Sequence, residues 1–166
     1  MAVRELRYFG DPVLTSACDP VKTFDKATQA LVADLMDTVR APGRAGLAAP
    51  QIGVGMRVFS YDVDGLSGYV INPEIVELSA ETHEIGEGCL SVPELRFPTE
   101  RAQRAVVRGV DLRNEPITVE GRDVLAQCLQ HETDHLDGVL YLDRLTADRK
   151  RQAFKQARGT SWFWNG

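Results

Sequence analysis

Hydrophobic residues recur at helical spacing in the first quarter of the chain. Leucine, valine and methionine occupy positions 31, 32, 35, 36 and 39 of the segment 24–40. Positions three and four residues apart share one face of an α-helix, so this segment predicts an amphipathic helix. Thr23 or Asp25 is its expected N-cap, and Pro42 and Gly43 end it. A loop of small residues is expected at 45–51.

The middle of the chain carries short runs of apolar and β-branched residues, broken by glycine, asparagine and proline. These runs predict strands at 57–62, 69–72, 75–78, 81–86, 105–112 and 117–120. The pattern therefore favours an antiparallel or mixed sheet over repeating βαβ units.

The spacing becomes helical again from about Asp123. One stripe of this predicted helix collects Val124, Cys128, His131 and His135. Gly138 is the residue type that usually ends such a helix, and a last helix is expected at 147–158. The expected fold class is α+β: antiparallel or mixed β-sheets packed around a central helix, with an N-terminal and a C-terminal helix.

Length and charge restrict the class of protein. The 166 residues, with 43% hydrophobic and 26% charged content, fit a single catalytic domain over 1–166, with its C-terminal helix and tail at about 146–166. A net charge of -5 gives no general attraction to DNA or to an anionic membrane. Residues 1–7 lack the apolar core of a signal peptide, and no stretch is long enough to cross a bilayer. A cytoplasmic location is expected.

Three cysteines, Cys18, Cys89 and Cys128, are too few and too scattered for a disulfide framework. In a reducing compartment each is a thiol that serves as a core residue, a metal ligand or a nucleophile.

The most specific motif is His131-Glu132-Thr133-Asp134-His135, an H-E-x-x-H sequence. The two histidines share a helix face and can bind one cation, while Glu132 is placed to act as a base beside it. Catalytic sites of this kind normally need a third protein ligand and one open position for water.

The source of the third ligand separates the known classes of such sites. A histidine at 141 is excluded by Tyr141, and no glutamate follows Glu132. The aspartates that remain have no supporting motif: Asp137, Asp143 and Asp148. Upstream, Cys89 offers a thiolate after a glycine at the end of a polar strand.

Three segments together resemble the signature motifs of the peptide deformylase family. They are Gly-Leu-Ala-Ala-Pro-Gln at 46–51, Glu-Gly-Cys-Leu-Ser at 87–91 and Gln-His-Glu-Thr-Asp-His-Leu-Asp-Gly at 130–138. Their order and separations also resemble the family, from Arg4 to about Leu145. One departure is Arg44, which stands where the family usually begins its first motif with glycine.

The resemblance implies a metal-dependent hydrolase that removes the formyl group from the N-terminal formyl-methionine of newly synthesised polypeptides. The implied metal ligands are Cys89, His131 and His135. Glu132 would take a proton from water and deliver it to the departing nitrogen. Gln51 and the backbone N–H of Leu90 would stabilise the oxyanion.

The same resemblance implies the cation and the supporting residues. The family characteristically uses Fe²⁺ and binds Zn²⁺ with lower activity, so Fe²⁺ is expected first, with Zn²⁺, Ni²⁺ and Co²⁺ as alternatives. Glu87 is expected to hold the loop of the cysteine ligand by pairing with Arg101. The expected substrate-binding residues are Gly46, Arg96, Val124 and Cys128.

Two other functions remain open at this stage. One is a cytosolic H-E-x-x-H metallopeptidase, and the other is a non-catalytic, metal-containing module associated with the ribosome. The basic residues of 147–158 suit a contact with ribosomal RNA as well as an ordinary solvated helix face.

Overall fold

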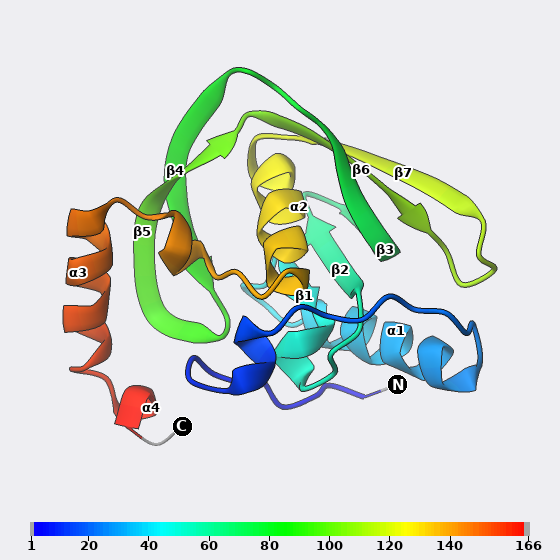
Figure 1. The fold of residues 1–166 in the computed structure, drawn as a ribbon, viewed down its shortest axis with the longest axis horizontal. Coiled ribbons are helices and arrows are strands. Elements are labelled where there is room, and N and C mark those ends of the chain that lie inside the picture. The colour runs from blue at the N-terminus through cyan, green and yellow to red at the C-terminus, as the bar shows by residue number, and fades with distance from the viewer. Residues whose placement is uncertain (1, 165–166) are drawn as a thin grey trace.

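The computed structural model describes residues 2–164; Met1 and the last two residues of the expected tail lie outside the described part. The first helix, α1, runs over Lys26–Val39, as its hydrophobic spacing predicts (Figure 1). Of the two expected caps, Asp25 is the one that acts, because its side chain accepts a hydrogen bond of 3.1 Å from the backbone N–H of Thr28.

Five strands form one antiparallel sheet in the order β1-β2-β3-β6-β7. Their bounds are Gly46–Ala48 for β1, Val58–Val63 for β2, Leu66–Leu78 for β3, Arg104–Val110 for β6 and Pro116–Arg122 for β7. A second sheet is the antiparallel pair β4, Thr82–Cys89, and β5, Val92–Ala102. The expected α+β class is confirmed.

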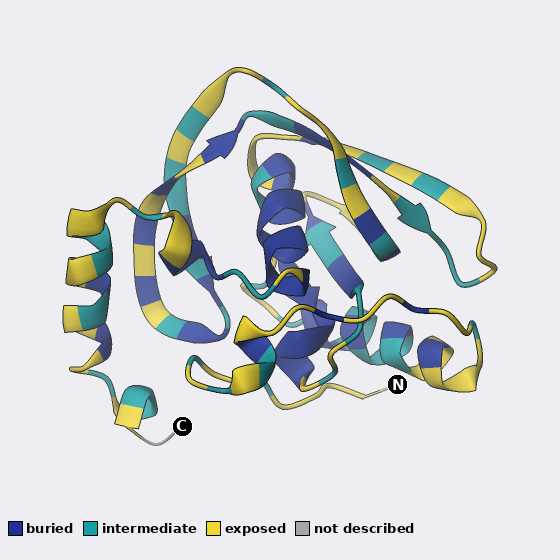
Figure 2. Cartoon of the chain, viewed as in Figure 1, coloured by how far each residue is buried: buried dark blue, intermediate teal, exposed yellow. Residues whose placement is uncertain are grey.

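The helix α2, Asp123–Leu136, lies at the centre, and the two sheets curve around it (Figure 1). Figure 2 shows that it is buried over most of its length, and Gln127 is its one residue after Val124 that is not buried. Gly138 follows with a φ of +74°, where a Cβ would lie 2.9–3.0 Å from the backbone of Thr15 and Ser16. Glycine therefore ends the helix as the sequence predicts.

The two faces of the large sheet hold different helices. Phe59 and Val70 pack with Leu129 and Leu136 of α2. Val58 and Ile71, next to them on the same two strands, point the other way and pack with Leu47 of β1 and with Val32 and Leu35 of α1. This alternation is the period-2 pattern of strands buried on both faces, and it places α2 in the interior.

The chain closes with three short elements after α2. These are the 3₁₀ turn Tyr141–Arg144, the helix α3, Ala147–Ala157, and the short helix α4, Ser161–Trp164. Helix α3 lies outside the hairpin of β4 and β5, and its Ala153 and Ala157 are buried (Figure 1). Among the described residues, no helix has both the length and the apolar character needed to cross a membrane.

The strand predictions were wrong in three places. The expected loop of small residues contains β1, which pairs with β2. The expected strands 69–72 and 75–78 are parts of one long β3, whose pairing with β6 is interrupted near Asn72. Strand β5 was missed entirely, because Pro93 and Pro98 and its many charged residues conceal the strand pattern.

Candidate metal centre and substrate pocket

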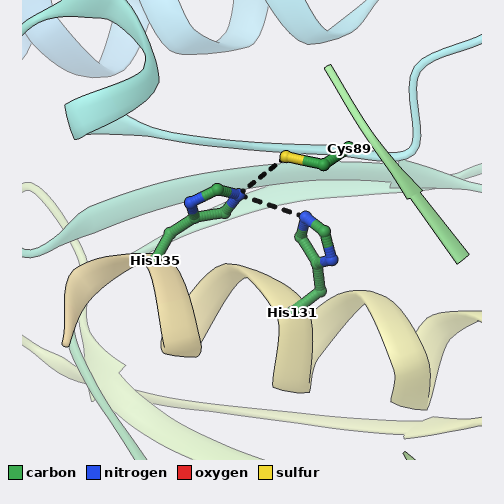
Figure 3. Close-up of side chains that lie close together, drawn as sticks. All are labelled: Cys89, His131 and His135. Carbon is green, nitrogen blue, oxygen red and sulfur yellow. Dashed lines mark hydrogen bonds between the residues drawn. The ribbon is translucent and has the colours of Figure 1, made fainter. Parts of the chain in front are cut away.

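Three buried side chains, one from β4 and two from α2, lie close together. Cys89 is the last residue of β4, and His131 and His135 lie one turn apart on α2 (Figure 3). The Nε2 atom of His135 lies 3.3 Å from Cys89 Sγ and 3.1 Å from His131 Nε2. All three ligand atoms lie within 4.8 Å of one another. Within residues 2–164, this is the one such group that suits a metal ion.

The geometry fits a single cation. Bonds of about 2.0–2.3 Å that meet near the tetrahedral angle separate their ligand atoms by roughly 3.3–3.6 Å. The measured separations of His135 Nε2 from the other two ligand atoms, 3.1 and 3.3 Å, are close to that range. One thiolate and two imidazoles are a donor set for a transition metal, and they leave a fourth position open.

The orientation of His131 depends on Glu87. The Nδ1 atom of His131 lies 2.5 Å from Glu87 Oε1, so a proton on Nδ1 leaves Nε2 free to bind a cation. The expected pair of Glu87 and Arg101 is also formed, with hydrogen bonds of 2.7 and 3.0 Å. Burial opposes ionisation of Glu87, but the hydrogen bonds from His131 and Arg101 lower its pKa to about 2.

The buried ion pairs extend further than the sequence indicated. The Nη1 atom of Arg101 donates to Asp134 at 2.7 Å, and Arg144 donates to the same carboxylate at 2.9 Å. Neither Asp134 nor Arg144 was predicted as part of the site. The available signal was Asp134 inside the histidine motif, one residue before a ligand, where a solvated charge would be out of place on a buried helix.

Glu132 is also buried, with 3% of its surface exposed. Its Oε2 atom has no hydrogen-bond partner among the described residues. Burial raises the pKa of Glu132 to about 7. Desolvation likewise lowers the pKa of His135 well below its ordinary value, which favours the neutral imidazole that a metal ligand requires.

Gln51 holds the small-residue loop against the end of β4. Its Oε1 atom accepts from the N–H of Ala48 at 2.9 Å, and its Nε2 atom donates to the hydroxyl of Ser91 at 3.2 Å. The same nitrogen lies 3.7 Å from Cys89 Sγ. The sequence pointed to Gln51 but not to Ser91, whose hydroxyl positions the amide.

A pocket of about 440 Å³ opens beside the histidines and Glu132. Its lining includes every residue expected to bind substrate, namely Gly46, Arg96, Val124 and Cys128, and it also includes Leu90, the expected oxyanion donor. Gln127 and Arg44 also line it. The guanidinium of Arg44 donates to the carbonyl of Thr38 at 2.8 Å, so the residue that departs from the family motif joins the pocket rim to the end of α1.

His83 lies apart from this centre. Its side chain is partly buried, with 17% of its surface exposed, and its Nδ1 atom lies 3.8 Å from Asp123. Its Nε2 atom is buried without a partner in the described chain. The three ligands form a group without it.

Comparison with known proteins agrees with this fold. The sequence profile of the polypeptide deformylase family matches residues 3–151. The peptide deformylase of Acidothermus cellulolyticus is 52% identical over 163 residues, which cover 98% of this chain and 89% of that protein. The crystal structure of a peptide deformylase from Legionella pneumophila matches with a TM-score of 0.88 and 37% identity, over 95% of each chain.

A second solved structure supports the same assignment. The peptide deformylase of Thermotoga maritima matches with a TM-score of 0.83 and 40% identity, over 88% of this chain and 99% of that one. Sequence identity this high over nearly the full length indicates common family membership as well as a shared fold. The chain therefore belongs to the polypeptide deformylase family.

Proposed function

We propose that the protein removes the formyl group from the N-terminal formyl-methionine of newly synthesised polypeptides and releases formate. The observation that carries this proposal is the group Cys89, His131 and His135 beside the buried Glu132, at a pocket of about 440 Å³. The relatives named peptide deformylase support the same reaction. Because this substrate is made on ribosomes, we infer a cytoplasmic location.

The side chains of the site would divide the reaction between them. A divalent cation held by the cysteine and the two histidines would supply a Lewis acid and lower the pKa of water towards neutrality. Glu132 would accept a proton from the attacking water and pass it to the departing nitrogen. Its burial and its unpaired Oε2 atom leave one carboxylate oxygen available for that proton.

Two hydrogen-bond donors would stabilise the negative charge that develops on the formyl oxygen. The amide of Gln51 reaches within 3.7 Å of Cys89 Sγ, beside the ligand group. The backbone N–H of Leu90 follows the same cysteine, and Leu90 lines the pocket. Removing one donor of this kind reduces the rate by about 10²–10³-fold.

The pocket would bind the methionine side chain and the peptide that follows it. Val124, Cys128 and Leu90 would supply apolar walls, and Gly46 would leave room for the substrate. Arg96 is exposed at the pocket and would bind the substrate backbone.

For the cation we propose Fe²⁺, with Zn²⁺, Ni²⁺ and Co²⁺ as alternatives that the same donor set accepts. The test is anaerobic purification with metal analysis, followed by activity after each metal is added back. The highest activity should come with Fe²⁺. Full activity with Zn²⁺ and none with Fe²⁺ would refute this choice.

The reaction itself is tested by formate release from a formyl-Met-Ala-Ser peptide. The wild-type protein should release formate without cleaving an internal peptide bond, and Cys89→Ser should abolish the activity through loss of a metal ligand. Internal cleavage would favour the metallopeptidase instead. One class of such peptidases has its third histidine at the position of Tyr141. Here Tyr141 is buried, with its ring 6.2 Å from that of His131, and it cannot replace a histidine ligand of that class.

We also propose that α3 contacts the ribosome through cations that no carboxylate of the described chain neutralises. Three of its cations already pair with carboxylates: Arg149 with Glu84, Lys150 with Asp143 and Arg151 with Asp148. Lys155 and Arg158 have no such partner in residues 2–164. Co-sedimentation with ribosomes at low salt should weaken in a Lys155→Ala, Arg158→Ala double variant, and unchanged association would remove the contact.

A further inference from the structure

The wall of the pocket next to Cys89 is an irregular part of β5. The ladder pairs Gly88 with Arg96 and then Cys89 with Val92, so Pro93, Glu94 and Leu95 bulge out between two successive pairs. All three bulged residues line the pocket. Glu94 has a φ of +68°, a left-handed conformation that is unfavourable for a residue with a side chain. This wall therefore needs support from outside the ladder.

The C-terminal segment supplies that support. The indole N–H of Trp162, in α4, donates a hydrogen bond of 3.0 Å to the carbonyl of Pro93. Its ring and that of Phe163 pack against the apolar cluster that contains Cys89, Val92 and Leu95. A residue far away in the sequence thus holds the first carbonyl of the bulge.

The N-terminal loop joins the same contacts. Phe9 donates its backbone N–H to the carbonyl of Ser91 at 2.8 Å, and its ring stacks 6.4 Å from that of Phe163. Ser91 is the residue whose hydroxyl accepts from Gln51. The turn between β4 and β5 is therefore held from three sides, by the tail, by the N-terminal loop and by Gln51.

We propose that Trp162 is a positioning residue for the substrate pocket, because its indole holds the bulge Pro93–Leu95 in the shape that contacts the bound peptide. Bulges beside active sites aim side chains that a regular ladder would direct elsewhere. The inference rests on the proposed deformylase function for its substrate, but the contact between the tail and the bulge is independent of it. Loss of the indole N–H should weaken substrate binding more than it slows the chemical step.

Two tryptophans of α4 give a matched test. Trp162→Phe keeps an aromatic ring and removes the hydrogen bond to Pro93. Trp164→Phe also removes an indole hydrogen bond, of 2.7 Å, but that bond goes to the carbonyl of Arg158 within the tail, and Trp164 is 68% exposed. We expect Trp162→Phe to raise KM for formyl-Met-Ala-Ser by about fivefold, equivalent to about 1 kcal/mol, with kcat within about twofold. Trp164→Phe should leave both unchanged.

Hydrogen–deuterium exchange of the metal-loaded protein supplies a readout besides activity. The backbone amides of Glu94, Leu95 and Arg96 should exchange faster in Trp162→Phe than in the wild type, and Trp164→Phe should match the wild type. Unchanged exchange in Trp162→Phe, an equal change in both variants, or faster exchange with an unchanged KM would each overturn the proposal. If the wild-type protein released no formate, the proposed function would fail, and the exchange measurement alone would decide whether Trp162 holds the bulge.

Discussion

At the scale of single residues, Glu132 is distinguished by how little space surrounds it. A Cβ placed on Gly46 would collide with its Oε1 atom and would lie 2.7 Å from Cys128 Sγ. The carboxylate is therefore packed from β1 as well as desolvated. This close approach explains why the first motif has a glycine at position 46. One substitution at Glu132 and one at Gly46 can therefore test the chemistry of the carboxylate and its packing separately.

Glu132→Gln removes the proton acceptor and keeps the shape of the side chain. We expect the rate of formate release to fall by about 10²–10⁴-fold, the usual contribution of a general acid–base group. Metal content and the free energy of unfolding should stay close to wild type. Formate release, metal analysis and urea unfolding measure these three quantities. A variant that keeps its metal and more than about a tenth of the activity would refute the catalytic role.

Gly46→Ala should impair the site without removing any functional group. Because the new methyl group must displace the carboxylate of Glu132, we expect activity to fall by about 100-fold, as small misplacements of a catalytic group do. Overpacking should also reduce stability by about 1–3 kcal/mol. Gly55→Ala is the control, since a Cβ there meets nothing within 4 Å. Equal activity of the two variants would contradict this reading of the packing.

The sequence predicted these residues unevenly, for reasons visible in the structure. Cys89, His131 and His135 carry chemistry that few other roles require, so their identity and spacing pointed to the site before its geometry was known. Ser91 acts through one hydroxyl toward Gln51, and Pro93 acts through a backbone carbonyl. Serine hydroxyls and carbonyls of this kind occur throughout any chain, so sequence alone could not select them.

At the scale of elements, α2 combines the site with a group of buried, paired charges. Arg101, on β5, joins Glu87 of β4 to Asp134 of α2, and its side chain is only 4% exposed. The same ion pairs orient His131 through Glu87. The two strands and the helix are therefore tied together behind the ligand group.

Two arginines allow this to be tested, since each bridges two carboxylates. Arg101→Met leaves Glu87 and Asp134 buried without their shared cation, and we expect a loss of about 3–5 kcal/mol in the free energy of unfolding. Arg104→Met removes the bridge between Glu77 and Glu120, whose side chains are 58% and 53% exposed, and should cause a much smaller loss. Urea unfolding compares the two. Similar losses in the two variants would show that burial does not determine how much these ion pairs contribute to the free energy of unfolding.

The elements themselves were predicted best where one face is apolar. Helices α1 and α3 appear within two residues of their expected bounds at each end, because their inward residues recur at helical spacing. Strand β5 was missed because its inward positions include Thr99 and Arg101, so burial there does not follow hydrophobicity. Arg101 is buried because it pairs with the carboxylates beside the ligand group. The local pattern of apolar and polar residues does not reveal such a contact.

At the scale of the whole molecule, the centre depends on segments that are distant in the chain. Cys89 and His135 are 46 positions apart, and they meet because β4 ends at Cys89 beside the C-terminal half of α2, where both histidines lie (Figure 3). The tail from α4 reaches the same turn through Trp162. A cation that binds Cys89, His131 and His135 would therefore cross-link the small sheet to the central helix, and stability of the entire fold should depend on it.

Metal removal tests this directly. A cation at 100 times its Kd stabilises the folded state by about 2.7 kcal/mol. In a domain of this size 1 kcal/mol shifts Tm by about 2–4 °C, so the metal-loaded protein should melt about 5–10 °C above the chelated one. Differential scanning calorimetry after chelation, and again after metal is restored, measures the shift. Cys89→Ser is the control: it keeps the size of the side chain, lacks the thiolate, and should show little increase on adding metal. An equal increase in Cys89→Ser and wild type would mean that the stabilising cation binds elsewhere.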